Sequence, residues 1–354
     1  MPIIAKFKIE YTRYLDPGGE PVREFPEQLR DAKTLIPLYK AMIENRAFDS
    51  KAIALQRTGQ LGTYASSLGQ EAIGVGIGAA MREDDILIPS YREYGAQFWR
   101  GVQMREILLY WSGDERSGDY QNQKHDLPIC VTIGAHAGHA VGVGYALKLE
   151  GGTRAAVCTL GDGATSKGDF YEGINAAGTW QLPVVFVVAN NQYAISMRRD
   201  RQSGAETLAQ KGIAAGIPSE QLDGNDIVAV SAAMNSALDR AREGEGPTLL
   251  EMMTYRMSDH TTADDASRYR KEEEVSRHWK EDPIARLKTY LVKSKVWSKE
   301  DEESLQKAAT AKAAEEAEAY LAMDPQPAVS MFDSLYEALP GALAEQREEV
   351  LNTP

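Results

Sequence analysis

The alternation of apolar and polar segments predicts two fully buried strands separated by one helix. Short apolar runs cover residues 155–160 (AAVCTL) and 184–189 (VVFVVA). Runs of this length are typical of strands in a parallel sheet that is covered on both faces. Parallel strands end at the same edge of a sheet, and ligands bind at that carboxyl edge in open α/β sheets. We therefore expect a binding site just after residues 160 and 189.

Further patterns extend this sheet and predict the helices that cover it. Apolar runs at residues 86–89, 129–133 and 247–254 are typical of additional buried strands. Apolar residues recur at approximately helical spacing, or helix-forming residues predominate, in seven other segments. These segments are residues 33–58, 67–81, 134–149, 207–217, 228–242, 283–292 and 299–321. The predicted fold class is α/β, a parallel twisted sheet flanked by helices, with a helical C-terminal extension.

The two ends of the chain differ from this central part. Residues 1–26 alternate between apolar and polar and break at Asp16-Pro17-Gly18-Gly19, which predicts a hairpin or an arm. Residues 331–339 form a last apolar segment that we expect to dock on the body. We divide the chain into an N-terminal arm (1–30), an α/β domain (31–275) and a helical extension (276–354) that packs on the same domain.

Polar groups follow both central strands. The first strand ends in Gly161-Asp162-Gly163, and the second ends in Asn190-Asn191. Carboxylate and amide oxygens suit Mg²⁺, which takes its remaining ligands from water and phosphate. Gly163 and Ala164 stand before a predicted helix, whose free N–H groups favour a diphosphate. The alternative is a tight turn and a helix cap without a ligand, but the pairing of the two motifs favours a magnesium–diphosphate site.

The succession of GDG, a helix and NN resembles the thiamine diphosphate-binding motif. The longer string GDGATSKGDFYEGINAAGTWQLPVVFVVANNQYAIS is similar to alpha subunits of the heteromeric 2-oxo acid dehydrogenases of the pyruvate and branched-chain types. Matches at SYREYG, VTIGAH, GEGPTLLEMMTYR and DHTTADDASRYR extend the resemblance over residues 35–339. It implies that domain 31–275 binds thiamine diphosphate and Mg²⁺.

The same resemblance implies residue roles. Tyr91 and Arg92 would bind the diphosphate, for which a guanidinium is well suited. His260 would lie beside the reactive end of the cofactor, where it donates a proton or orients a lipoyl group. The metal ligands would be Asp162, Asn191 and the main-chain oxygen of Tyr193. Gly163 and Ala164 would contact the diphosphate. The main chain of Val131 and Ile133 would hold the aminopyrimidine ring.

Several other motifs carry weaker signals. The glycines at 74, 76 and 78 do not have the spacing of a dinucleotide fingerprint and follow no strand, which argues against a nicotinamide-dependent oxidoreductase. His136 and His139 lie one helical turn apart, but no third ligand at zinc spacing accompanies them. His136 falls where the resembling family often has glutamine. Arg256 matches a Tyr-Arg pair of that family by motif only.

The composition of the chain limits which classes of partner and which cellular compartment we expect. The 354 residues carry 39 basic and 52 acidic side chains, a net charge of −13, which disfavours nucleic acid and anionic membranes as partners. Cys130 and Cys158 both lie in apolar runs and suggest a reducing compartment. No secretory leader or membrane-spanning run is evident, so we expect the bacterial cytoplasm rather than the mitochondrial matrix.

The resemblance also implies partners. Related enzymes need an activating glutamate from a second α/β domain, and this chain has sheet material for one domain only. We therefore expect a separate beta subunit in an α2β2 heterotetramer, with transfer of the acyl group to the lipoyl domain of a dihydrolipoyl acyltransferase. Pyruvate is the expected substrate, with branched-chain 2-oxo acids or acetoin as alternatives. A non-catalytic assembly subunit is the alternative from another class.

Overall fold

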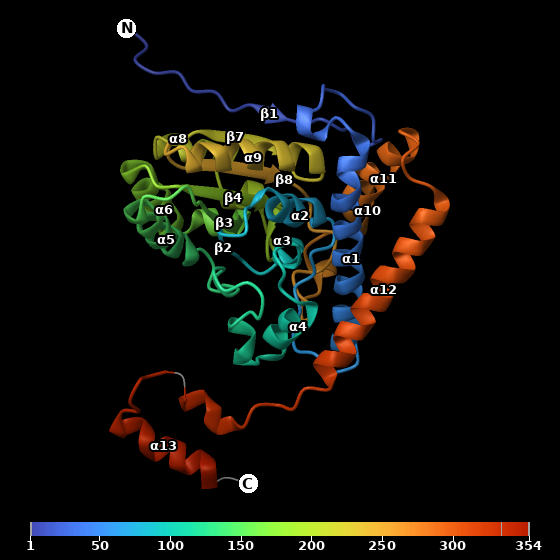
Figure 1. Cartoon of the computed structure of the whole chain (residues 1–354). Helices are drawn as coiled ribbons and strands as arrows, with labels where there is room; N and C mark the ends of the chain where they lie inside the picture. The colour runs from blue at the N-terminus through green and yellow to red at the C-terminus, as the bar shows by residue number, and fades with distance from the viewer. Residues whose placement is uncertain (1, 334, 353–354) are drawn as a thin grey trace.

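The structure is a computed structural model that describes residues 2–333 and 335–352 (Figure 1). Its centre is a six-stranded sheet in the order β1-β7-β8-β4-β3-β2, in which every neighbouring pair is parallel. The strands are β1 (Tyr11–Thr12), β2 (Ile86–Ile88), β3 (Ala156–Gly161), β4 (Val184–Asn190), β7 (Ser219–Asp223) and β8 (Thr248–Met253). The predicted α/β fold class is therefore confirmed.

Helices cover both faces of this sheet (Figure 1). On one face α2 and α9 pack against the inner strands and bury residues such as Ile77, Val230 and Met234. On the other face α5 and α6 bury Ala140, Phe170 and Ile174 against β3 and β4. The bounds are α1 (Ile36–Arg57), α2 (Glu71–Ala80), α3 (Tyr94–Trp99), α4 (Met104–Ser112), α5 (His136–Glu150), α6 (Gly168–Trp180), α8 (Gln210–Ala214) and α9 (Ile227–Arg242).

The register of the central strands creates the site. All seven residues of β4 are buried, and Gly161 of β3 pairs with Ala189 of β4. The two strands therefore end side by side, as expected for two short apolar runs in one parallel sheet. Asp162 follows one strand end and Asn191 follows the other, which brings the two polar groups to the same edge of the sheet.

Residues 129–133 and strand β7 differ from the sequence-based expectation. Residues 129–133 are not a strand: this segment is irregular and runs along the outer side of β2, where Cys130 N donates to Pro89 O. Pro128 has no N–H to donate, and Val131 is 50% exposed, so the apolar run lacks the buried strand neighbours that its composition suggests. β7 was missed because its sequence SEQLD is polar, and only its last two residues are buried.

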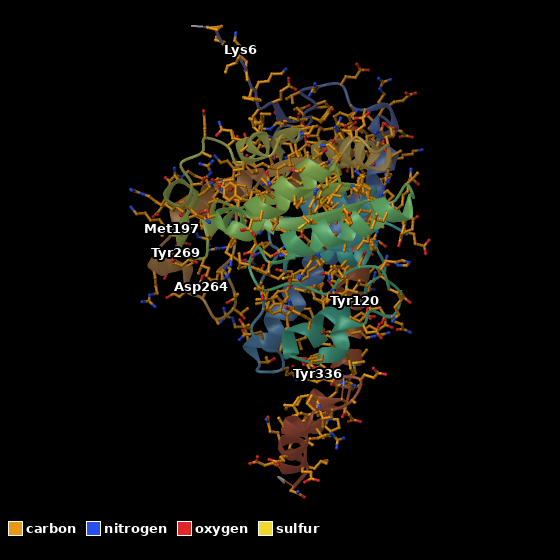
Figure 2. All side chains as sticks on the ribbon, turned by 90° about the vertical axis from the view of Figure 1, so that its left-hand side faces the viewer. Lys6, Tyr120, Met197, Asp264, Tyr269 and Tyr336 are labelled. Atoms are coloured by element: carbon orange, nitrogen blue, oxygen red, sulfur yellow. The ribbon has the colours of Figure 1, made fainter. Side chains whose placement is uncertain are left out.

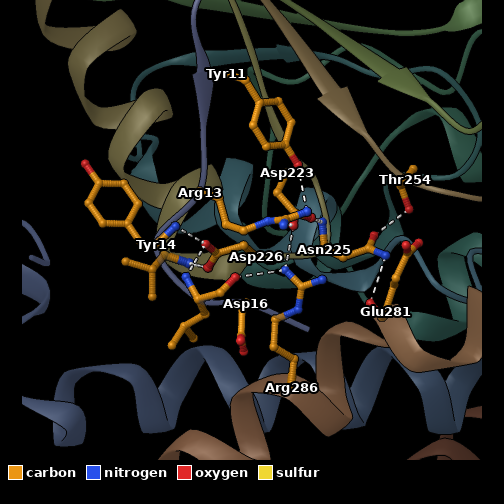
Figure 3. Close-up of polar contacts among 12 residues, drawn as sticks. Tyr11, Arg13, Tyr14, Asp16, Asp223, Asn225, Asp226, Thr254, Glu281 and Arg286 are labelled. Carbon is orange, nitrogen blue, oxygen red and sulfur yellow. Dashed lines mark hydrogen bonds and ion pairs between the residues drawn. The ribbon is translucent and has the colours of Figure 1, made fainter. Parts of the chain in front are cut away.

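The N-terminal segment is fixed to the body by a buried polar cluster (Figure 3). β1 pairs with β7, and Asp226 Oδ2 accepts hydrogen bonds from the N–H groups of Tyr14 and Leu15 at 2.6 and 2.8 Å. Asp223 forms ion pairs with Arg13 and with the buried Arg286 at 2.7 and 2.8 Å. Residues 11–30 thus lie against the domain, and the domain boundary at residue 30 stays a prediction.

The C-terminal third begins with helices on the body and ends away from it. Helices α10 (Glu272–His278), α11 (Pro283–Lys293) and α12 (Lys299–Leu321) precede α13 (Gly341–Asn352), and α12 packs along α1 through Ala309, Ala313 and Ala317. Figures 1 and 2 show the segment that carries Tyr336 and α13 projecting from the body. Met331, Leu335 and Tyr336 are 49%, 63% and 56% exposed, so most of the apolar side chains described in residues 331–339 are not docked on the body as expected, although Phe332 is buried.

The remaining predicted boundaries stay predictions, and residues 1, 334 and 353–354 within them lie outside the described residues. Across the part of the chain that the structure describes, no helix combines the length and apolar composition needed to cross a membrane.

Candidate functional site

A cavity of about 490 Å³ lies at the carboxyl ends of β2, β3 and β4. Each of the ten residues predicted from the sequence lines it, although they come from five separate stretches of the chain. They are Tyr91, Arg92, Val131, Ile133, Asp162, Gly163, Ala164, Asn191, Tyr193 and His260. The structure thus brings the predicted residues together, while their contacts with a ligand stay predictions.

Three oxygens converge at the floor of this cavity. The side-chain oxygen of Asn191 lies 3.3 Å from Asp162 Oδ1 and 3.0 Å from the main-chain oxygen of Tyr193. Rotating the amide would place its nitrogen there as a hydrogen-bond donor to both. In the present orientation the Asn191 oxygen accepts a long hydrogen bond from Tyr193 N–H at 3.4 Å and still faces the other two oxygens, an arrangement that a bound cation would stabilise. Oxygen ligands of this kind suit Mg²⁺.

The burial of the Asp162 carboxyl is only partly compensated. The side chain is 3% exposed, and Oδ2 has no hydrogen-bond partner among the described residues. Burial raises the pKa of this carboxyl to about 6, against smaller opposing effects of main-chain hydrogen bonds at Asp162, Asn191 and Gly163 and of the positive charge of Arg256. A cation at the three oxygens would favour the ionised carboxylate and remove the cost of burying it.

The loop after β4 is held in an unusual conformation. Gln192 and Ile195 have φ of 73° and 55°, left-handed values that cost non-glycine residues free energy. Arg256, which is fully buried, donates from Nη2 to Ile195 O at 2.8 Å and from Nη1 to Tyr193 O at 3.3 Å. Arg256 therefore fixes the main-chain oxygen that faces Asp162, a role that its motif alone did not indicate.

Two side chains hold the turn that follows β3 by hydrogen bonds to its main chain. A Cβ on Gly163 would lie 2.8 Å from Ala194 Cβ, so the close approach of the two loops requires glycine. Gln202 Nε2 donates to Gly163 O at 2.9 Å, and the buried Lys211 donates from Nζ to Thr165 O at 2.6 Å. Neither side chain was expected from the sequence, because neither belongs to a motif and only the fold brings them to this turn.

Arg92 and His260 face each other across the cavity wall. Arg92 donates from Nη1 to Ser66 O at 2.6 Å, while its Nη2 lies 3.0 Å from His260 Nδ1. Burial and the positive charges of Arg92 and Arg256 lower the pKa of His260 to about 4. His260 is therefore neutral at pH 7. Because Nδ1 accepts from Arg92, the ring proton lies on Nε2.

Glu71, Gln70 and the two histidines at 136 and 139 differ in how they relate to the cavity. Glu71 is fully buried, pairs with Arg46 at 2.7 Å and accepts from Gly69 N–H, whereas the neighbouring Gln70 lines the cavity. The zinc alternative finds no support, because the described residues contain no group of three or more His, Cys, Asp or Glu side chains suited to a metal. His136 is buried beside the cavity and His139 is exposed.

Comparison with known proteins gives consistent similarity along the chain. A family model described as dehydrogenase E1 component matches residues 39–329. The chain is 41% identical to the pyruvate dehydrogenase E1 component subunit alpha of Acholeplasma laidlawii, over 94% of this chain and 97% of that protein. The corresponding protein of Staphylococcus aureus is 39% identical over 96% and 92% of the two chains.

A relative with a different printed substrate is about equally similar. The 3-methyl-2-oxobutanoate dehydrogenase subunit alpha of Mycobacterium tuberculosis is 39% identical, over 98% of this chain and 95% of that protein. Identity at this level therefore does not separate the two substrate types.

Proposed function

Because this chain belongs to the dehydrogenase E1 component family, as the alpha subunit of a thiamine diphosphate-dependent 2-oxo acid dehydrogenase, we propose that its substrate is pyruvate. The acetyl group would pass to the lipoyl arm of a dihydrolipoyl acetyltransferase. Two alpha subunits of pyruvate dehydrogenases, at 41% and 39% identity over nearly the whole chain, support pyruvate. The branched-chain relative at 39% keeps 3-methyl-2-oxobutanoate as the second candidate, and acetoin is the third.

The residues of the cavity fit thiamine diphosphate and Mg²⁺, which family membership implies. The convergence of Asp162, Asn191 and Tyr193 oxygens, together with the unpartnered Asp162 Oδ2, is the observation that carries this proposal. These three residues would hold the metal ion. Tyr91 and Arg92 would bind the diphosphate beside the turn of Gly163 and Ala164, and the main chain of Val131 and Ile133 would hold the aminopyrimidine ring.

The chemistry divides between the cofactor and the chain. When bound, thiamine diphosphate supplies a thiazolium ring that accepts the electrons released as a 2-oxo acid loses carbon dioxide. The chain positions this group and supplies a hydrogen-bond donor from Nε2 of the neutral His260. The same N–H can orient an incoming lipoyl group by donating a hydrogen bond, whereas transfer of a proton would need the doubly protonated ring. Arg92, which fixes the proton of His260 on Nε2, thereby sets the direction of donation.

The cavity is open, which supports a site completed by a partner. Val131, Ile133 and Ile195 at its margin are 50%, 40% and 55% exposed. Exposed apolar side chains around a cofactor cavity are typical of a surface that another subunit covers. The family implies a beta subunit and a lipoyl domain as partners, and an α2β2 heterotetramer would place the beta subunit over this margin. The bacterial source of the relatives supports the cytoplasm as the compartment.

The test is an artificial-acceptor assay of the chain co-expressed with its beta subunit, with thiamine diphosphate and Mg²⁺. We expect kcat/KM to be highest for pyruvate among pyruvate, 3-methyl-2-oxobutanoate and acetoin, and the chain alone to be inactive. Preference for either other substrate would overturn the pyruvate assignment. Activity that is independent of thiamine diphosphate, or full activity of the chain alone, would overturn the divided site. A complex that binds the cofactor but turns over none of the substrates would favour the assembly-subunit alternative.

A further inference from the structure

Asp49 is a buried carboxylate that the proposed function does not use. It lies on α1 and is 3% exposed. Its Oδ1 accepts hydrogen bonds from Tyr64 OH and from Ser67 N–H, each at 2.8 Å, and its Oδ2 accepts one from Ser66 Oγ at 2.6 Å. A buried carboxylate needs such donors. Here all of them belong to one short segment of the chain, so Asp49 acts on that segment as a unit.

The 62–67 segment lies between α1 and α2 and belongs to neither a helix nor a strand. Its last four residues are nevertheless buried, so their main-chain N–H and C=O groups need partners from other parts of the fold. Asp49 accepts from Ser67 N–H, and Tyr94 OH donates to Ala65 O at 2.8 Å. Side chains of α1 and α3 therefore determine the path of this segment.

The same segment contacts both members of the Arg92–His260 pair. Ser66 O accepts a hydrogen bond from Arg92 Nη1 at 2.6 Å. Tyr64 N–H donates to Thr262 Oγ1 at 2.9 Å, and Thr262 N–H donates to Tyr64 O at 2.8 Å. Thr262 stands two residues after His260 in the same loop. The segment thus holds the guanidinium at one point and the histidine loop at another.

We propose that Asp49 is a positioning residue for the reaction. Its carboxylate fixes the 62–67 segment, which in turn places Arg92 and the loop of His260 at the cavity. Asp49 is not among the described residues that line this cavity, so its effect passes through the hydrogen bonds of other residues. The inference rests on the proposed function, because that function assigns the diphosphate to Arg92 and the lipoyl group to His260.

Two substitutions separate the hydrogen bonds of Asp49 from its charge. Asp49→Ala leaves the Ser67 N–H and the hydroxyls of Tyr64 and Ser66 without their acceptor. Asp49→Asn keeps Oδ1 for Tyr64 OH and Ser67 N–H. Its amide nitrogen takes the place of Oδ2, where the Ser66 hydroxyl can rotate to accept from it. Both variants lose the negative charge, but only Asp49→Ala releases the 62–67 segment.

Glu106→Ala is the matched control for Asp49→Ala. Glu106 is another buried carboxylate, on α4, and it accepts hydrogen bonds from the main-chain N–H groups of Gln103 and Gln121, each at 2.7 Å. Neither of these partners is among the described residues that line the cavity. The loss of Glu106 should destabilise the chain without loosening the loop of His260.

The first measurement is hydrogen–deuterium exchange of the complex with the beta subunit, thiamine diphosphate and Mg²⁺. A peptide that contains Thr262 N–H reports on the loop, and β4 serves as the reference for global opening. We expect Asp49→Ala to accelerate exchange at residues 260–264 by about tenfold, while β4 exchanges as in wild type. Asp49→Asn should stay within about threefold of wild type, and Glu106→Ala should match wild type at residues 260–264.

The second measurement separates placement of His260 from loss of folded enzyme. It compares kcat/KM for the lipoyl domain as acceptor with kcat/KM for an artificial acceptor, to which the proposed function assigns no contact with His260. We expect the ratio of the two values to fall about tenfold in Asp49→Ala and to recover in Asp49→Asn. A smaller folded fraction would lower both values equally and leave the ratio unchanged.

The outcomes decide between positioning and plain stability. Unchanged exchange at residues 260–264 in Asp49→Ala, or equal acceleration in β4, would overturn the positioning role, as would an unchanged activity ratio. If Asp49→Ala does not fold, Tyr64→Phe removes one hydrogen bond to Asp49 and keeps the ring. Exchange at residues 260–264 should then rise about threefold in Tyr64→Phe, and no rise would overturn the role.

Failure of the proposed function would look different. In that case the wild-type complex would neither bind thiamine diphosphate nor decarboxylate a 2-oxo acid. The exchange comparison of wild type, Asp49→Ala and Glu106→Ala needs neither property, so it would still decide whether Asp49 places the loop of His260.

Discussion

Arg92 contacts His260 twice: its Nη2 donates to the main-chain oxygen at 2.6 Å and faces the ring Nδ1 at 3.0 Å. A fixed positive charge next to an imidazole disfavours a second proton on the ring. The pair therefore links a residue expected to bind the diphosphate to one expected to act at the reactive end of the cofactor. The contact makes the ionisation of His260 depend on Arg92.

Removing the guanidinium should raise the pKa of His260. In Arg92→Gln we expect a rise of about one unit from the value of about 4, since burial continues to oppose the charged ring. The measurement is an NMR titration of the protein labelled at histidine Cε1, with His260→Asn to assign the signal. Arg268→Gln, an exposed position in the same loop, should leave the titration unchanged. An equal His260 pKa in wild type and Arg92→Gln would contradict the coupling.

The lowered pKa of His260 also makes the free energy of unfolding depend on pH. Because the pKa of His260 is lower in the folded than in the unfolded chain, the unfolded chain binds more protons between about pH 6.5 and 4. The contribution of neutral His260 is complete above pH 6.5 and falls as the pH drops through this window. The fall in unfolding free energy should be shallower in Arg92→Gln, measured by urea denaturation at several pH values.

Asp162→Asn should stabilise the cofactor-free chain while it weakens metal binding. The pKa of this carboxyl is raised from 3.8 to about 6, so the ionised form costs up to about 3 kcal/mol above pH 6, and this cost vanishes below about pH 4. Asparagine cannot ionise and should raise the free energy of unfolding at pH 8 but hardly at pH 4. Urea denaturation without metal checks this.

The predicted loss of metal binding in Asp162→Asn needs a separate control. The stabilisation that Mg²⁺ with thiamine diphosphate gives to wild type should be lost in Asp162→Asn. Asp169→Asn changes an exposed carboxylate on α6 and should retain it. Equal stabilisation of wild type and Asp162→Asn would remove Asp162 from the metal site.

Gly163→Ala should cost more than Gly161→Ala, although both glycines flank Asp162. The new methyl at 163 would meet Ala194 Cβ at 2.8 Å, whereas nothing lies within 4 Å of a Cβ at 161. We expect Gly163→Ala to lower the free energy of unfolding by about 1–3 kcal/mol and Gly161→Ala by less than about 1 kcal/mol. Chemical denaturation of the cofactor-free protein measures both. Equal losses would mean that the two loops separate at little cost.

Lys211→Met should loosen the turn behind the metal site. The buried ammonium donates to Thr165 O and Oγ1, and methionine keeps much of the volume but neither bond. We expect a loss of about 2–3 kcal/mol in unfolding free energy and weaker Mg²⁺-dependent cofactor binding, measured by denaturation and calorimetry. Lys312→Met, on the exposed face of α12, is the control and should change neither. Unaltered cofactor affinity in Lys211→Met would limit its role to stability.

The sequence predicted those parts of the fold and site in which one short segment contains enough information. β3 and β4 are buried along nearly their whole length, so composition alone identifies them. β7 is partly exposed and polar, and the run at 129–133 lies along an edge, so local composition misrepresents both. Their true state depends on which neighbours the complete fold provides.

The same distinction between local and long-range information applies to the site. The GDG and NN motifs are local, and their convergence follows from the parallel register of β3 and β4. Lys211, Gln202 and Asp226 act on main-chain groups that lie 46, 39 and 212 residues away in sequence, and no pattern around them signals those contacts. Such long-range bonds between a side chain and a main-chain group become visible only with coordinates.

Both margins of the central sheet are protected against further strand addition. β1 covers β7 with only two residues, and beyond β2 the irregular segment 127–133 donates to Leu87 O and Pro89 O. An incoming strand from another molecule would thus find few free main-chain groups in line, which is how natural proteins avoid uncontrolled edge-to-edge aggregation. A variant in which mutations turned residues 129–133 into a regular strand would lose that protection at the β2 edge of the sheet.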